Sequence, residues 1–482
     1  MNGDSLTGLG NHISRIDKLR YIERDRGYFD YAPFGWSIWR VLRFYVFRRA
    51  DAVEIYGESP RTLRRVLRSA VGVLLIARAI LQRQEANILY KSCRTDLRIK
   101  TSAGYFDTFL DTALSRRADY LKMEEVNSES FSLQASQALV KSDINPATVN
   151  FLAHICAKIS RSRRFKEFTS QIAEEIRQAC GLELNANEMA QLAARTYWQE
   201  KIYSLILRRL SIKVVVLTDT GDYGLRLAAL KLGISVIEIQ HGVFDESHPD
   251  AVPGWVAGGR FRNIEPDILI VRGDFSKAVL RNSRLFPDRL LACGYEPIDR
   301  ARALMASTAK SPVADSQIRV LFSSQGYDRD RLSKWILDFI DAKPLSVRLR
   351  VQLKLHPFYD TDESVFHNLR QYANVDVVPG SDERSIYELL QAADVHMSIS
   401  SNAHYDAAAL GVPSLIIPLT GFEIVAKFAD NISIYLVSDA TSAWNYISDP
   451  KIYRRAQANM FFYCEDNFDD RVERILESTL RS

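Results

Sequence analysis

The feature that most constrains this chain is a series of short apolar runs that alternate with helical segments, and the series occurs twice. Each run is four or five residues long and rich in β-branched and aliphatic residues, which is the length of a strand buried on both faces. Buried strands that alternate with helices predict parallel sheets built from βαβ units. The expected strands are Asn87–Tyr90, Val214–Leu217, Val236–Ile239, Ile268–Val271 and Leu290–Cys293 in the first series, and Arg319–Phe322, Val351–Leu355, Val375–Val378, His396–Ile399 and Ser414–Ile417 in the second.

The two series divide the chain into two α/β units. We expect a helical N-terminal region over residues 1–84 and a first unit over 85–302, with a helical insertion at about 119–210. A Ser- and Pro-containing linker over 303–317 leads to a second unit over 318–482. With 482 residues, 47% of them hydrophobic, the chain can fill both cores, which excludes a disordered or low-complexity protein. In doubly wound sheets the ligand lies beyond the carboxyl ends of the strands, so we expect the site in the cleft between the units.

Positive charge is concentrated at the N-terminus. Residues 1–100 hold 19 Lys and Arg against 10 Asp and Glu, whereas the whole chain has a net charge of only +4. This distribution argues against nucleic acid as a partner. Residues 34–83 combine Trp and Phe with arginines, so two hypotheses stay open: a helical hairpin packed on the protein body, or a surface that binds anionic membranes. The longest apolar run, residues 70–77, is too short to cross a bilayer.

Two strand ends of the first unit carry candidate catalytic residues. Asp219 and Asp222 lie in Thr218–Gly224, directly after an expected strand. A carboxylate there can accept a proton, although Asp and Gly also favour turns for their own sake. The next strand ends at Gln240-His241-Gly242, where the imidazole can shuttle a proton or contact an anion. Asp219, Asp222 and His241 therefore remain alternative bases.

Two strand ends of the second unit carry candidate phosphate contacts. His356-Pro357 follows one strand, and Lys354 stands two residues earlier. Pro restricts the backbone of the preceding residue and so helps to fix the direction of the imidazole. Ser400-Ser401-Asn402 follows another strand and leads into an expected helix, where hydroxyl and backbone N–H groups can hold phosphate. The alternative for the serines is a plain helix cap.

Known short motifs exclude several classes. The chain has no GxxxxGK[ST], no GxGxxG after a strand and no HExxH, which weakens NTPase, dinucleotide-binding and zinc-protease hypotheses. The acidic residues form no evident metal cage, so we expect no metal and no cofactor. Five dispersed cysteines indicate reduced thiols and hence a cytoplasmic location.

Four short motifs, in this order, resemble those of a known group of proteins: Gln240-His241-Gly242, Gly294–Asp299, Lys354–Pro357 and Ser400–Pro413. The set is similar to bacterial GT-B glycosyltransferases of capsule and lipopolysaccharide assembly, which include sialyl- and Kdo-transferases. Teichoic-acid-type glycerophosphotransferases share related features. The resemblance covers about residues 211–440.

The resemblance implies a GT-B-like fold, with two Rossmann-like units facing a cleft. It implies a nucleotide-sugar donor, CMP- or UDP-linked, held mainly by the second unit, and a glycan or lipid-linked acceptor held by the first. In the related enzymes an HP motif and a serine pair contact the nucleotide, which matches His356-Pro357 and Ser400-Ser401. Asp406 stands where such enzymes often carry a Glu, and an acidic-glycine motif supplies their base.

The expected function is a metal-independent glycosyltransferase that extends a bacterial surface glycan or its lipid-linked precursor. Such an enzyme would work in the cytoplasm, or at the inner membrane face if the N-terminal region binds lipid. Three alternatives stay open: a CDP-alcohol glycero- or ribitolphosphotransferase, a sugar-nucleotide epimerase, and a non-catalytic protein that has kept the fold.

Overall fold

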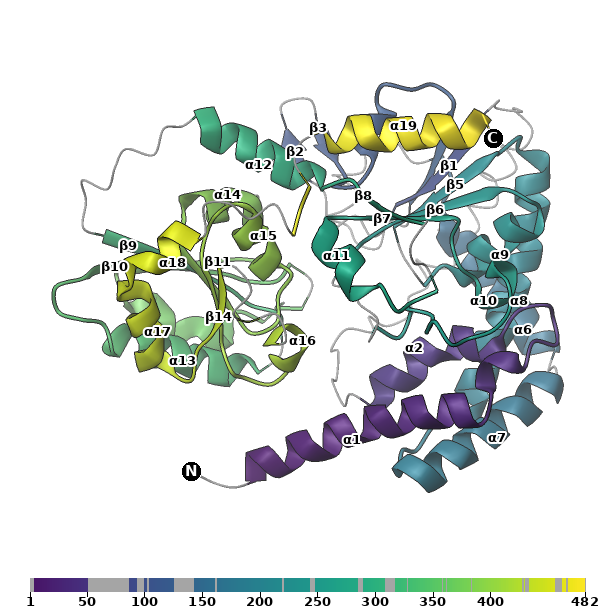
Figure 1. The fold of residues 1–482 in the computed structure, drawn as a ribbon, viewed down its shortest axis with the longest axis horizontal. Coiled ribbons are helices and arrows are strands. Elements are labelled where there is room, and N and C mark those ends of the chain that lie inside the picture. The colour runs from purple at the N-terminus through teal and green to yellow at the C-terminus, as the bar shows by residue number, and fades with distance from the viewer. Residues whose placement is uncertain are drawn as a thin grey trace.

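The computed structural model describes residues 4–50, 86–92, 99–101, 104–124, 143–160, 163–218, 221–242, 248–284, 289–307, 317–326, 328–357, 359–360, 362–382, 384–426, 429, 433–455, 462–464 and 467–481. These residues form two α/β units that lie side by side, and the N-terminal helices lie along one flank of the first (Figure 1).

The first unit is built on a parallel sheet in the order β4-β1-β5-β6-β7-β8. The early strand β1 pairs with β5 in parallel, with Ile88 opposite Val214, which confirms that it belongs to this sheet. A small antiparallel hairpin lies beside the sheet. The strands of this unit are β1 Ile88–Lys91, β4 Tyr120–Met123, β5 Val214–Leu217, β6 Ser235–Ile239, β7 Ile268–Val271 and β8 Leu290–Ala292, with β2 Ile99–Thr101 and β3 Gly104–Phe106 in the hairpin.

The second unit has a parallel sheet in the order β11-β10-β9-β12-β13-β14. This order, with the first strand next to the fourth, is that of the doubly wound dinucleotide-binding fold. Both six-stranded sheets, counted over the described residues, agree with the fold expected from the alternating pattern. The strands are β9 Gln317–Ser323, β10 Arg348–Lys354, β11 Val375–Val378, β12 Val395–Ser398, β13 Ser414–Ile416 and β14 Ile434–Leu436.

Helices cover both sheets. Those before the linker are α1 Asp4–Asp25, η1 Tyr28–Asp30, α2 Ile38–Ala50, α4 Asp111–Leu114, α6 Pro146–Ser160, α7 Arg163–Cys180, α8 Ala186–Arg209, α9 Tyr223–Lys231, α10 Arg260–Asn263, α11 Asp274–Val279 and α12 Glu296–Ser307. Those after it are α13 Arg329–Asp341, η3 Ser364–Gln371, α14 Ile386–Ala392, α15 Ala403–Ala409, α16 Glu423–Ala426, α17 Ala440–Ser448, α18 Pro450–Arg455 and α19 Phe468–Arg481.

The last helix, α19, packs on the first unit although it follows the second in sequence. It contacts α4, α12 and β5 and lies along one edge of the first unit (Figure 1). Its first residue donates a backbone hydrogen bond to Asp299, and Arg471 donates to the carbonyl of Ala292. The chain therefore crosses between the units a second time, which ties them together at two places.

The expectation that residues 119–210 are helical is wrong at its start. Residues Tyr120–Met123 form the edge strand β4, paired with β1. This strand was missed because Lys122 breaks its apolar run, yet the Lys122 side chain is fully buried and pairs with Asp107 at 2.9 Å. The helical insertion proper consists of α6, α7 and α8.

The membrane hypothesis for the N-terminal region is contradicted over residues 34–50. The side chains of Trp36, Trp39 and Phe47 are buried in a core shared with α7 and α8, so they are not available to lipid. Two of the arginines, Arg40 and Arg43, are buried as well. The packing alternative is therefore correct for this segment, and residues 51–83 lie outside the described residues. Among the described helices, none has the length and apolarity needed to span a bilayer.

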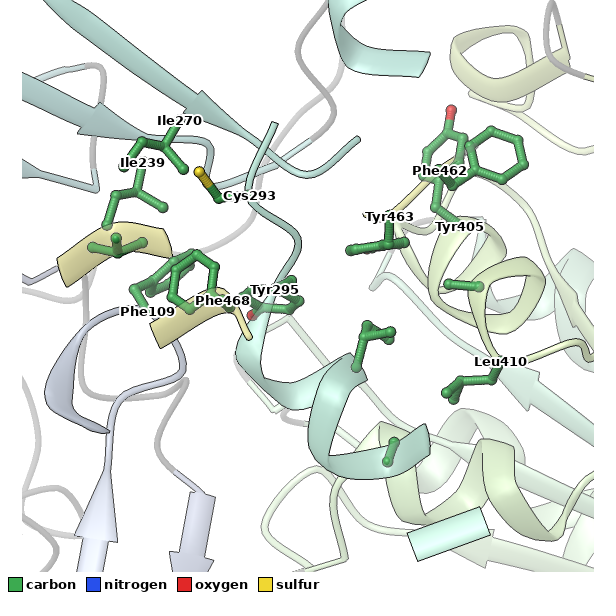
Figure 2. Close-up of a cluster of buried hydrophobic side chains, with 14 of the residues drawn as sticks. Phe109, Ile239, Ile270, Cys293, Tyr295, Tyr405, Leu410, Phe462, Tyr463 and Phe468 are labelled. Atoms are coloured by element: carbon green, nitrogen blue, oxygen red, sulfur yellow. The ribbon is translucent and has the colours of Figure 1, made fainter. Parts of the chain in front are cut away.

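Among the described residues, one apolar cluster joins the two units. Figure 2 shows Tyr295 between Phe109 and Phe468 on one side and Tyr463 on the other. The ring of Tyr295 lies 5.7 Å from that of Phe109 and is stacked at 6.2 Å on that of Tyr463. The cluster continues into α15 through Tyr405 and Leu410. The polar groups around this apolar contact form the candidate site.

Candidate functional site

Each sheet has a topological switch point, where consecutive connections leave in opposite directions and open a crevice at the carboxyl ends of two neighbouring strands. In the first unit the switch lies between β1 and β5, and in the second between β9 and β12. These two crevices are the places where a doubly wound unit binds ligands most often.

The predicted residues Ser400, Ser401 and Asn402 lie at the switch point of the second unit. Ser323, at the end of β9, is opposite Ser398 in β12, and the turn begins two residues later. The Ser400 hydroxyl donates to Gln325 Oε1 at 3.2 Å, so it bridges the two strand ends. The Ser401 hydroxyl accepts from the backbone N–H of Ala403 at 3.1 Å. Both serines are nearly buried, at 8% exposure, and shape the turn.

A polar network that the sequence analysis did not assign supports this turn from below. Ser414 Oγ lies 2.7 Å from Nδ1 of both His396 and His404, and the other ring nitrogen of His396 lies 2.9 Å from Ser323 Oγ. Burial lowers the pKa of both imidazoles, that of His404 to about 3, so both are neutral at pH 7. The network links β9, β12, β13 and α15 and so fixes the floor of the crevice.

The end of β10 carries the predicted phosphate contacts Lys354, His356 and Pro357, and the structure shows what the side chains of Lys354 and His356 contact. Burial lowers the pKa of His356 to about 4, which leaves the imidazole neutral at pH 7. Its Nδ1 accepts from the backbone N–H of Tyr359 at 3.3 Å. The Lys354 ammonium donates to the carbonyls of Pro379 and Asp382, at 2.9 and 3.2 Å. These contacts hold the loops after β10 and β11 together, and the predicted contact of this segment with phosphate stays a prediction.

The turn after β6 is stabilised by hydrogen bonds of Gln240, one of its own residues. Gln240 accepts from the backbone N–H of Arg272 at 3.1 Å and donates to the carbonyl of Gly242 at 2.8 Å. His241 is exposed, and its ring lies 5.9 Å from that of Phe109. A side chain added at Gly242 would begin 3.6 Å from the amide of Asn402, so this turn directly faces the start of α15. The structure thus brings Gln240, Gly242 and Asn402 together.

The carboxylate candidates lie at the switch point of the first unit. Asp222 directly precedes α9 and forms an ion pair with Lys91, the last residue of β1. The two side chains are 16% and 12% exposed, so the pair is sheltered but reachable from solvent. A nearby ammonium favours the ionised form of a carboxylate, the form that a general base needs. Asp219 lies outside the described residues.

Arg272 is the central residue of the junction between the units, and it was missed from the sequence. It follows β7 directly and donates to Tyr463 at 2.5 Å and to the carbonyl of His241 at 3.2 Å. It also pairs with Asp406 of α15 at 3.5 Å, and its guanidinium carbon lies 4.4 Å from the centre of the Tyr295 ring. Its position at a strand end is the same signal that identified His241.

Asp406 lies in this junction. Its side chain is 6% exposed, and its carboxylate accepts from Tyr463 and faces Arg272. In the structure this carboxylate makes a contact between the two units, and its predicted role in substrate binding stays a prediction. A small pocket adjoins this contact and is lined by Gln240, Gly242, Arg272, Phe275, Ser276, Val279, Asn402, Tyr405, Phe462 and Tyr463.

Within the part of the chain that the structure describes, no cluster of three or more His, Cys, Asp or Glu side chains could hold a metal ion. The chemistry that the described residues offer is that of a carboxylate or an imidazole on the first unit and of hydrogen-bond donors on the second. These groups lie on opposite sides of one junction.

The arrangement of the two units is that of the GT-B fold, and solved structures share it. The S. aureus protein MnaA, in a co-structure with UDP, matches with a TM-score of 0.52 at 12% identity, over 82% of this chain and 97% of that one. A UDP-N-acetylglucosamine 2-epimerase matches with a TM-score of 0.50 at 14% identity, over 82% and 96%. At such identities the likeness establishes the fold alone.

The wall teichoic acid polymerase TagF also matches, with a TM-score of 0.46 at 12% identity, over 87% of this chain and 97% of that one, which is too low a score to bear on function. No protein-family profile matches the sequence, and no curated protein is significantly similar to it.

Proposed function

We propose that the protein is a glycosyltransferase that moves a sugar from a nucleotide-activated donor to a glycan or lipid-linked acceptor. The observation on which the proposal rests is the close approach of Gly242 to Asn402, which line one pocket at the junction of the two units. A group-transfer enzyme needs such an arrangement, because donor and acceptor must meet at a distance that permits direct attack. The coarser part of the proposal, a protein that handles sugar nucleotides, agrees with the UDP-bound and epimerase structures that share the fold.

In this proposal the second unit holds the nucleotide. The turn at Ser400–Asn402 and the neighbouring Gln325 offer hydroxyl and amide groups at a switch point of dinucleotide-binding order. Because His356 is neutral and Lys354 is engaged with backbone carbonyls, hydrogen bonds would provide more of the phosphate recognition than charge would.

The first unit supplies the base that deprotonates the acceptor hydroxyl. Asp222 is the better described candidate because its carboxylate forms an ion pair with Lys91, and a nearby cation favours the ionised form of a carboxylate. His241 is the alternative, because its imidazole is exposed beside the turn that faces α15. Asp219 remains a third candidate on the same loop. Substitution of the residue that acts as the base should lower kcat and leave the affinity for nucleotide unchanged.

An epimerase is the second candidate, because a protein of that activity shares the fold over 96% of its length. The two functions differ in one respect that an assay can read. An epimerase converts its nucleotide sugar without an acceptor, whereas a transferase releases the nucleotide only when an acceptor is present.

The first experiment is a thermal-shift panel of UDP, CMP, CDP, GDP and their sugar conjugates, because a ligand that binds only the folded state raises the melting temperature. We expect a shift with one nucleotide, reduced in Ser400→Ala and retained in Ser478→Ala. Ser478 is a matched control because it is exposed on α19 and bonds only its own helix in the contacts described. No shift with any nucleotide would favour the non-catalytic alternative and overturn the proposal.

The second experiment follows the bound nucleotide sugar by NMR, alone and with membrane glycan fractions. Nucleotide release that depends on the glycan supports the transferase. Conversion of the free nucleotide sugar identifies an epimerase, and release of CMP from CDP-glycerol identifies an alcohol-phosphate transferase.

A further inference from the structure

The N-terminal helix α2 contributes two buried arginines to the first unit, and both reach the same distant segment. Arg40 donates to the carboxylate of Asp250 at 2.9 Å and to its carbonyl at 2.7 Å. Arg43 donates to the carbonyls of Pro249 and Ala251, at 2.6 and 3.1 Å. Four hydrogen bonds from one helix therefore hold residues 249–251, which lie within the connection from β6 to β7.

Arg40 also reaches the start of α9. It donates to the hydroxyl of Tyr223 at 3.0 Å, and that hydroxyl donates in turn to Asp250. Tyr223 is the first residue of α9 and directly follows Asp222. The Arg40 guanidinium thus connects two places: the backbone beside the candidate base Asp222, and the segment that follows the candidate base His241.

The cost of burying this triad indicates that it fixes geometry more than it adds stability. Arg40, Tyr223 and Asp250 are 2%, 6% and 4% exposed. Burial alone would raise the pKa of Asp250, but Arg40, His248 and Tyr223 lower it well below its usual range, so the carboxylate stays ionised. A buried ion pair is often no more stabilising than apolar side chains of similar volume, whereas its directional bonds define one arrangement.

We propose that Arg40 is a positioning residue: it fixes the start of α9 beside the candidate base Asp222, and residues 248–251 of the connection that follows the candidate base His241. The proposal rests on the proposed function for its effect on turnover, but its structural part stands on the contacts alone. It also gives the N-terminal helices a role inside the protein: they serve as a brace behind the acceptor side of the site.

The test compares Arg40→Met with Arg48→Met by hydrogen exchange and mass spectrometry. Arg48 lies on the same helix and is exposed, with its guanidinium 5.3 Å from the ring centre of Phe44, so it is a matched control. We expect faster exchange over residues 221–226 and 248–252 in Arg40→Met and no change in Arg48→Met. Unchanged exchange in Arg40→Met would overturn the proposal.

Tyr223→Phe separates the two loops and guards against a variant that fails to fold. It removes the hydroxyl that bonds both Arg40 and Asp250 but leaves the Arg40–Asp250 pair intact, so exchange should rise more over 221–226 than over 248–252. Arg40→Lys should fall between wild type and Arg40→Met, because an ammonium cannot reproduce the fork of the guanidinium. Equal exchange in both loops in Tyr223→Phe would contradict the arrangement described here.

Measurements of kcat and KM test whether the positioning by Arg40 affects catalysis. With UDP-N-acetylglucosamine, a CMP-linked sugar and CDP-glycerol as donors, we expect Arg40→Met to lower kcat by about 10- to 100-fold with the donor KM within about twofold. If wild type consumes none of these donors, the proposed function fails, while the exchange result still decides whether Arg40 positions the loops. If exchange rises but kcat is unchanged, the positioning role fails and the proposed function stands.

Discussion

The sharpest prediction concerns Arg272→Met, which removes the charge at the junction and keeps an apolar side chain of similar length. Asp406 then loses its ion-pair partner while it stays buried, and such a carboxylate must either remain charged at high cost or take up a proton. Burial already raises the pKa of Asp406 in the intact protein, so protonation is the cheaper route.

The cost of protonation sets the size of the effect. To neutralise a carboxyl whose pKa in the unfolded chain is about 3.9 costs about 1.4 kcal/mol for each pH unit above that value, or about 4 kcal/mol at pH 7. The folded variant binds a proton that the unfolded chain does not, so its stability falls as the pH rises from about 4 to 7. The destabilisation should therefore be largest near neutral pH and smaller by about 2 to 3 kcal/mol at pH 5.

The assay is urea unfolding of wild type and Arg272→Met at pH 7 and pH 5. Arg319→Met is the control, because Arg319 is 46% exposed in its pair with Asp394, and such surface pairs contribute about 1 kcal/mol or less. The double variant Arg272→Met/Asp406→Leu should recover most of the loss. A destabilisation that is equal at both pH values, or a double variant no more stable than the single one, would refute this reasoning.

Three further predictions follow from single contacts, each tested by thermal or urea unfolding. Gly224→Ala should lower the free energy of unfolding by about 1 to 3 kcal/mol, because the new Cβ would overlap Cβ of Gln199 on α8. An unchanged unfolding midpoint would mean that α8 and α9 pack less closely than the structure shows. Trp39→Ala should lower the free energy of unfolding by about 3 to 5 kcal/mol, because this fully buried side chain fills the core under α2 and donates to Glu23 at 2.9 Å. Wild-type stability of this variant would support the membrane-surface hypothesis for α2. Burial raises the pKa of Asp469 to about 6, so the charge on this carboxylate opposes folding increasingly from about pH 4 to pH 6. Asp469→Asn should therefore stabilise the protein by about 2 kcal/mol at pH 7.5 and not at pH 4. The opposite pH trend would show that Arg116 stabilises the carboxylate.

The strands that could be predicted from the sequence are those whose short apolar runs alternate with helical segments, because strands of a parallel sheet are buried on both faces. Two described strands of the parallel sheets, β4 and β14, were not predicted, and neither were β2 and β3 of the small hairpin. In β4 the buried ion pair of Lys122 interrupts the run, and β14 has only three residues, Ile434–Leu436. The place of α19 on the first unit also could not be predicted, since its amphipathic pattern shows that one face is covered but not by which unit.

The candidate site, like the strands, could be predicted only in part from the sequence. Strand-end loops identify positions such as Gln240 and Ser400 because the sheet topology delivers them to one edge. The partner of each side chain depends on tertiary contacts that no local pattern encodes. The sequence does not show that burial keeps His356 neutral, nor that Asp406 pairs with Arg272 of the other unit.

The arginines of α2 show why composition alone misleads about function. A segment rich in Trp, Phe and Arg has the make-up of an interfacial helix, yet the same residue types suit a helix that is buried against polar loops. The difference lies in whether the guanidinium groups meet protein acceptors, and Arg40 and Arg43 meet carboxylates and carbonyls of the connection after β6. Arg272 does the same between the units. The buried arginines Arg40 and Arg272 thus both act on the loops at the strand ends of the first unit, where catalysis would require fixed positions and where an apolar core could not provide them.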